Sequence, residues 1–151
     1  MTTKRKTPLS TERLARNAKA GREARGWGLH ELARRSELAQ KTVYDFECMR
    51  VTPLIRTVAK LAEALGIDLE TIMMGTEEDV RAATWRAEIA ATLPALSTDT
   101  FAAIAAELRP GGLATNDPSA LLQAFDAGST GERVRAIATL RRAVVATKDP
   151  T

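Results

Sequence analysis

The sequence has one cysteine and one histidine, and each shortage argues against a class of protein. Cys48 has no second cysteine with which to form a disulfide, as is usual for proteins of a reducing compartment. His30 is not part of any cluster with the ligand spacing of a zinc site. No phosphate-binding glycine loop is present either. We therefore expect no metal, no other cofactor and no catalytic centre.

Long apolar runs are also missing. No segment approaches the roughly 18 apolar residues that a membrane-spanning helix needs. The first residues are basic, but no apolar stretch of the kind found in secretory signals follows them. We expect a protein that does not contact the membrane and is located in the cytoplasm.

Aromatic residues make up only 4% of the chain, so aliphatic side chains must form the core. Hydrophobic residues account for 44% and charged residues for 27%, which is the composition of a globular protein. The abundant residues, Ala, Leu, Glu and Arg, favour helices. No alternation of apolar and polar residues is long enough to predict a strand. The predicted fold class is all-α.

The two halves of the chain differ in charge. Residues 1–66 contain 14 Lys and Arg against 7 Asp and Glu, whereas residues 67–151 contain 8 against 12. A net charge of +7 on the first half indicates a polyanionic partner for that half alone. Chance clustering of charge on a solvated surface is the alternative.

Hydrophobic periodicity and helix-ending residues predict five short helices in a domain over residues 10–75. Residues 1–9 precede it as a flexible basic arm. Gly26, Gly66 and Gly75 are expected to end helices, and Asp68 to cap one. The expected helices cover residues 11–25, 28–36, 39–49, 54–65 and 69–74.

Residues 76–151 form a helical C-terminal region by the same criteria. Capping patterns begin at Thr76, Ser97, Asp117 and Ser129. We expect this region to dimerise the protein or to bind a protein partner. Its last helix offers a seam for a second subunit, formed by Val134, Ile137, Leu140 and Val144. Packing of these residues within one chain is the alternative.

The helices at 28–36 and 39–49 are joined by about three residues, among them Glu37 and Leu38. So short a link favours a crossing near a right angle, as in a helix-turn-helix. Spacing turns Val43 and Phe46 of the second helix inward. The opposite face then presents four residues that can contact bases in a major groove: Gln40, Lys41, Tyr44 and Asp45. An ordinary solvated polar face is the alternative interpretation.

Several stretches carry a resemblance to a known family. They are REARGW at 22–27, ELARRS at 31–36, Thr42-Val43, Glu47, Pro53 and LAEALGI at 61–67. Together they resemble the Cro/C1 (XRE-type) phage-repressor helix-turn-helix family over residues 13–75. The resemblance implies a five-helix domain that binds operator DNA as a two-fold homodimer. It also implies a buried ion pair between Arg22 and Glu47.

The chain departs from the family pattern at several positions. Gly28 and Leu29 stand where family members commonly have Ser or Thr and then Gln, which typically contacts a phosphate. Ala39 replaces a capping residue. Glu37 and Met49 replace glycines at positions that favour positive φ.

Phosphate contacts are expected from the N-terminus of helix 28–36, from helix 39–49, which we call the recognition helix, and from the loop after it. The candidates are Leu29, Thr42, Arg50, Thr52 and Arg56, with Lys4, Arg5 and Lys6 of the arm. We predict a sequence-specific regulator of transcription that binds double-stranded DNA and is associated with the nucleoid. We expect it to be a repressor and not an enzyme. An antitoxin or adaptor that binds protein through the same fold is the alternative.

Overall fold

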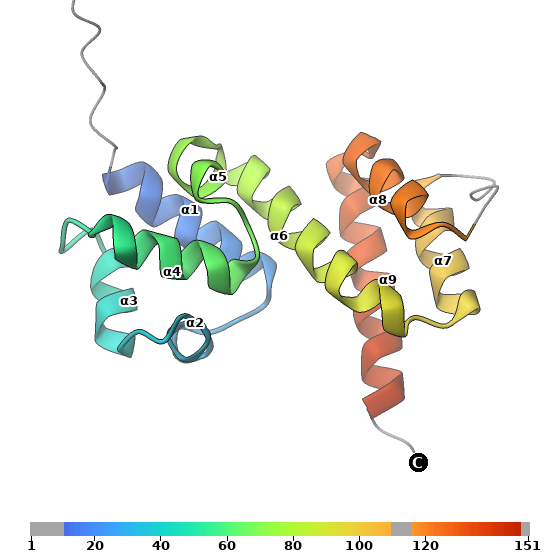
Figure 1. Ribbon diagram of the computed structural model, residues 1–151, viewed down its shortest axis with the longest axis horizontal. Coiled ribbons are helices and arrows are strands. Elements are labelled where there is room, and N and C mark those ends of the chain that lie inside the picture. Colours follow the sequence, from blue (N-terminus) through green and yellow to red (C-terminus); the bar gives the residue numbers. More distant parts are fainter. Residues whose placement is uncertain (1–10, 110–115, 149–151) are drawn as a thin grey trace, which may run out of the picture. The chain divides into compact units, whose positions relative to one another are not determined.

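The computed structural model describes residues 11–109 and 116–148. The arm residues Lys4, Arg5 and Lys6 lie outside these ranges. The chain divides into two compact units, Met1–Thr84 and Trp85–Thr151 (Figure 1). Within the described ranges the secondary structure consists of nine α-helices and one short 3-10 helix, with no strand. The predicted all-α class is confirmed.

Five short helices and the start of a sixth make up the first unit. They are α1 (Thr11–Ala24), α2 (Leu29–Ser36), α3 (Gln40–Glu47), α4 (Ile55–Leu65), α5 (Leu69–Met74) and the first half of α6 (Glu77–Thr92). The five-helix domain expected from the sequence is present. The helix predicted at 39–49 is shorter than expected, because Ala39 is its extended N-cap residue and Met49 has left the helical region.

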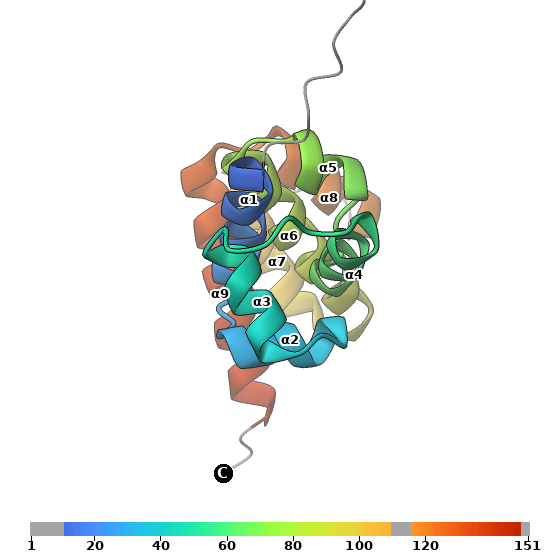
Figure 2. The same cartoon turned by 90° about the vertical axis from the view of Figure 1, so that its left-hand side faces the viewer.

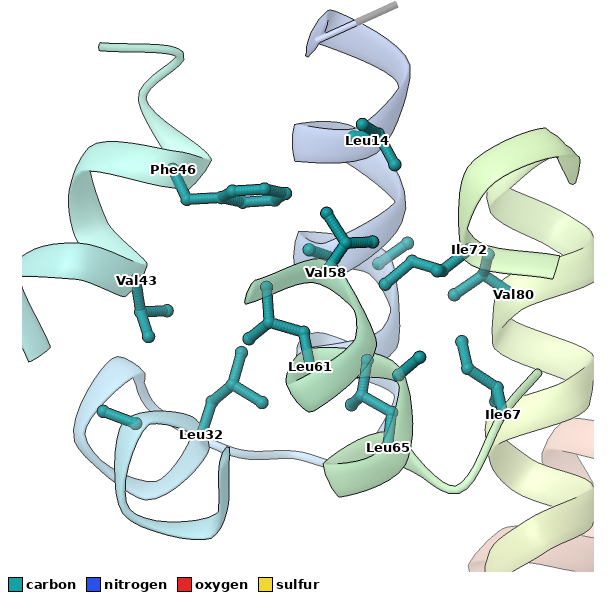
Figure 3. Close-up of a cluster of buried hydrophobic side chains, with 14 residues drawn as sticks. Leu14, Leu32, Val43, Phe46, Val58, Leu61, Leu65, Ile67, Ile72 and Val80 are labelled. Atoms are coloured by element: carbon teal, nitrogen blue, oxygen red, sulfur yellow. The ribbon is translucent and has the colours of Figure 1, made fainter. Parts of the chain in front are cut away.

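The core of the first unit surrounds α4. This helix buries Val58, Leu61 and Leu65 on one face and packs against α1, α2 and α5. In Figure 3, Val43 and Phe46 of α3 are directed into the same cluster. Such burial contributes about 1.5–3 kcal/mol for each large aliphatic or phenyl side chain.

One member of this core was not anticipated. Val80, on α6, is fully buried in the first unit's core, whereas Ile89 on the same helix belongs to the core of the second unit. The division between the units falls between Thr84 and Trp85, within α6.

The helix ends combine expected and unexpected features. Gly26 and Gly66 adopt the left-handed conformation, with φ of 71° and 75°. Glu37 and Met49 do the same, with φ of 57° and 58°, although neither is glycine. The predicted cap by Asp68 is wrong: this residue precedes α5 with extended backbone, but its side chain accepts no capping hydrogen bond.

Asn17 connects α1, the first helix of this unit, to the end of α5. Its side chain is buried, and Nδ2 donates to the carbonyl oxygens of Ile72 and Gly75, each at 2.9 Å. Since a buried amide without partners costs free energy, these bonds fix α1 against the end of α5. Gly21 allows a second close approach, because a Cβ there would lie 2.6 Å from Cδ1 of Leu65.

The second unit contains the end of α6, the 3-10 helix η1 (Leu93–Ala95), α7 (Thr98–Leu108), α8 (Pro118–Ala127) and α9 (Thr130–Lys148). Its α7 packs against α8 and α9. Ile137 and Leu140 are buried in this unit's own core, while Val134 is exposed. The proposed seam is therefore wrong for Ile137 and Leu140, and the alternative of packing within one chain is confirmed for them.

Capping in the second half of the sequence follows the predicted patterns. Thr76 Oγ1 accepts from the amide of Asp79 at 3.1 Å, and the Thr76 amide donates to Asp79 Oδ2 at 3.0 Å. This second bond holds the pKa of the Asp79 carboxyl below its usual value. Ser97, Asp117 and Ser129 accept from backbone amides in the same way.

Two ion pairs connect helices of the second unit. Arg141 Nη2 lies 2.9 Å from Glu88 Oε2, and Arg86 Nε lies 2.9 Å from Asp126 Oδ1. They join the end of α6 to α9 and α8.

A search of the described residues for a helix sufficiently long and apolar to cross a bilayer finds none.

Replacing Glu37 or Met49 by glycine should stabilise the first unit by about 0.5–1 kcal/mol each. Glycine avoids a steric penalty of about 1–2 kcal/mol at positive φ, but it loses more backbone entropy on folding. Urea unfolding of the full chain measures the change. Cys48→Gly is the control, since Cys48 has a φ of −84° and glycine gains nothing there. If both the Glu37 and Met49 variants are no more stable than the unchanged chain, the two residues are not strained by their positive φ.

Candidate nucleic-acid interface

A three-residue turn joins α2 to α3. The amides of Glu37 and Leu38 donate to the carbonyl oxygens of Arg34 and Ala33 at 3.3 and 3.0 Å, which closes the last turn of α2. Ser36 is buried and donates from its hydroxyl to the Leu32 carbonyl at 2.6 Å. Figure 2 shows α2 and α3 crossing at a steep angle in the first unit. This is the arrangement of a helix-turn-helix.

The second helix of the pair, α3, has two distinct faces. Val43 and Phe46 are 1% and 2% exposed. Gln40, Lys41 and Tyr44 are exposed on the other side. Asp45, expected to share that outward face, is instead half-buried, and its side chain is 18% exposed. The structure thus brings together three of the four base-reading candidates on one accessible surface.

An ion pair fixes the inner side of α3 to α1. Arg22 Nε donates to Glu47 Oε1 at 2.7 Å, and Nη2 donates to Oε2 at 3.0 Å. The remaining Nη1 donates to the Trp27 carbonyl at 3.0 Å. The side chains of Arg22 and Glu47 are only 14% and 8% exposed. The hydrogen bonds to Glu47 raise the pKa of the Arg22 guanidinium, so this guanidinium stays charged.

The first turn of α2 carries a carboxylate that the sequence reasoning missed. Glu31 pairs with Arg34 and Arg35 at 2.8 and 2.6 Å, and these guanidinium groups lower its pKa to about 2. Arg35 also lies over the ring of Trp27, 4.5 Å from its centroid, and Arg25 lies 4.9 Å from it. The i, i+3 and i, i+4 spacings are the signs by which the pairing can be found.

The phosphate candidates occupy three positions. Leu29 begins α2, where the first amides of a helix have no intrahelical acceptor, and its side chain packs on the core. Thr42 is half-buried on α3. Arg50, Thr52 and Arg56 are exposed in the loop after α3 and at the start of α4.

Arg50 folds back toward the recognition helix. Its Cζ lies 5.2 Å from the centroid of the Tyr44 ring, and its Nη1 lies 4.0 Å from Asp45 Oδ1. Its amide donates to the Asp45 carbonyl at 2.9 Å. Arg50, Tyr44 and Asp45 therefore form one cluster at the end of α3, which sequence spacing did not reveal.

No group of three or more His, Cys, Asp or Glu side chains able to hold a metal ion occurs at residues 11–109 or 116–148. What the surface offers is a polar, partly cationic helix face with an aromatic ring. Such a face suits hydrogen bonding and charge pairing with a nucleic acid.

The fold and the exposed face of α3 define a helix-turn-helix domain of the DNA-binding class. Residues 19–72 match the family model described as helix-turn-helix, which represents the Cro/C1-type (XRE) family of DNA-binding regulators. The match extends from α1 through α5 and includes both members of the ion pair. A search of the curated proteins and one of the solved structures gave no match.

Glu47→Gln should destabilise the first unit by about 3–5 kcal/mol, because it leaves the Arg22 charge buried without its counter-charge. Thermal and urea unfolding measure the loss. Glu63→Gln is the matched control: Glu63 is exposed on α4, and the substitution should change stability by less than about 0.5 kcal/mol. Unchanged stability of the Glu47 variant contradicts a structural role for the pair.

Proposed function

We propose that this protein is a sequence-specific regulator of transcription, acting as a repressor, that inserts α3 into the major groove of double-stranded DNA. One observation carries the proposal. Gln40, Lys41 and Tyr44 are exposed on one face of α3, while Val43 and Phe46 anchor the opposite face in the core. A major groove accommodates one helix, and its base edges offer partners to all three side chains.

Charge supports the same conclusion. The net charge of +7 lies on residues 1–66, which include the whole helix-turn-helix pair. Lys41, Arg50 and Arg56 are exposed cations on or near α3. In the proposed complex they neutralise phosphates on either side of the groove, with Thr42, Thr52 and the α2 amides at Leu29 as uncharged donors. Lys4, Arg5 and Lys6 extend the basic segment.

A protein-binding adaptor is the second candidate, and one surface favours it. Met49, Val51, Leu54 and Ile55 are each more than 40% exposed and follow α3 directly along the chain. Exposed apolar side chains in such number are more typical of a protein interface than of a phosphate contact. The missing cap at Ala39 also weakens the start of the recognition helix.

Salt dependence separates the two candidates. The affinity of the full chain for a random-sequence duplex should fall linearly on logarithmic axes as salt rises. Arg56→Gln should reduce that slope by about 1 for each bound chain, as expected when each chain loses one phosphate contact. Arg142→Gln makes the same charge change on α9 and should leave the slope unchanged. Binding that is insensitive to salt, or absent at low salt, favours the adaptor.

Operator symmetry tests the homodimer. Selection from a random duplex pool should yield a two-fold consensus with half-sites about 10 base pairs apart, or a multiple of this spacing. Sedimentation of the full chain with the selected duplex should give two protein chains for each DNA. A consensus without symmetry, bound by one chain, contradicts the dimer but not the base reading.

A further inference from the structure

Tyr44 differs from every other aromatic residue of the chain. It is 42% exposed, whereas the two tryptophans are half-buried and the three phenylalanines are buried, all within the described residues. An exposed ring on the polar face of a short helix is not needed for the core. Its position beside Gln40 and Lys41 therefore calls for a partner of its own.

The ring is held in place by its neighbours. The Arg50 guanidinium lies 5.2 Å from the ring centroid, a distance at which a cation is attracted to the ring face. Asp45 Oδ1 lies 4.0 Å from Arg50 Nη1, and the Arg50 amide is bonded to the Asp45 carbonyl. A ring supported in this way loses less conformational freedom when it binds.

Among the base edges of a major groove, the apolar group is the C5 methyl of thymine. Gln40 and Lys41 can serve the polar edges, but neither offers an apolar surface to that methyl. The carbon edge of Tyr44 does. The phenol hydroxyl is not required as a phosphate donor, since Arg50 brings a cation to the same place.

We infer that Tyr44 is a specificity-determining residue that contacts the C5 methyl of a thymine, with Arg50 and Asp45 as the residues that position its ring. The inference rests on the proposed function and makes it more specific. It also removes Asp45 from the base-reading residues: its half-buried carboxylate faces Arg50 and supports the ring indirectly.

Deoxyuridine, which lacks only the methyl group, provides the probe. Each thymine of the duplex recovered by selection is replaced in turn, and affinity is measured for the full chain. At one thymine in each half-site, replacement should weaken binding by about fourfold, as for one buried methyl group. Tyr44→Phe should keep this ratio, since the ring edge remains. Tyr44→Ala should bring it to one.

The role of Arg50 is tested by the same quantity, the ratio of the affinities for the thymine and deoxyuridine duplexes. A merely structural role of Arg50 would leave this ratio unchanged. Arg50→Ala should weaken binding to both duplexes and reduce the preference for thymine. Arg56→Ala, which removes an exposed cation from α4 without touching the ring, should weaken both duplexes equally. Because Tyr44 and Arg50 are exposed, their variants should keep the melting temperature of the unchanged chain.

The outcomes that overturn the inference are distinct from those that overturn the function. Equal binding of thymine and deoxyuridine duplexes at every position overturns the inference alone. So does a preference for thymine that Tyr44→Ala leaves unchanged, since it assigns the methyl contact to another residue. If selection recovers no shared sequence, the proposed function fails, and the inference fails with it.

Discussion

The ion pair between Arg22 and Glu47 is the constraint on which the recognition surface depends. It ties α3 to α1 through two hydrogen bonds, while a third bond from Arg22 holds the Trp27 carbonyl in the link before α2. A helix of eight residues does not persist in water by itself. The inner side of α3 is held by Val43, Phe46 and Glu47. The residues on its outer side are therefore not needed for the core and can contact a ligand.

Local sequence preferences around α3 oppose its geometry, and tertiary contacts outweigh them. Glu37 and Met49 adopt left-handed conformations that cost roughly 1–2 kcal/mol each in residues other than glycine. The absent cap at Ala39 costs about 1 kcal/mol more. Burial of Val43 and Phe46 returns about 1.5–3 kcal/mol each, and breaking the ion pair would cost about 3–5 kcal/mol. Burial of the two side chains, about 3–6 kcal/mol together, is thus comparable to the local costs of about 3–5 kcal/mol.

Features with a periodic or local origin could be predicted from the sequence. Spacing and short-range chemistry predict the helices, the turn at Glu37 and the capping boxes. They also predict the inward positions of Val43 and Phe46. Features that depend on distant residues could not. The bonds from Asn17 to α5 join residues more than 50 positions apart, and Val80 packs in a core that precedes it in sequence. Arg50 lies near Asp45 because the loop after α3 returns it toward that helix, a geometry that helical spacing does not predict.

The charged side chains around α2 and α3 differ in how closely they are paired. At the start of α2, the carboxylate of Glu31 offsets part of the charge of Arg34 and Arg35, and its pKa of about 2 keeps it ionised at any ordinary pH. A phosphate beside this group would therefore meet a smaller net positive charge than two unpaired arginines would present. After α3, Arg50 in the loop and Arg56 at the start of α4 are exposed, and Arg50 is only loosely paired with Asp45 at 4.0 Å. Lys41 in the first turn of α3 and Arg50 after its last turn are therefore both open to a phosphate, and Arg50 also supports the Tyr44 ring. Affinity and base selection would then depend on one shared side chain.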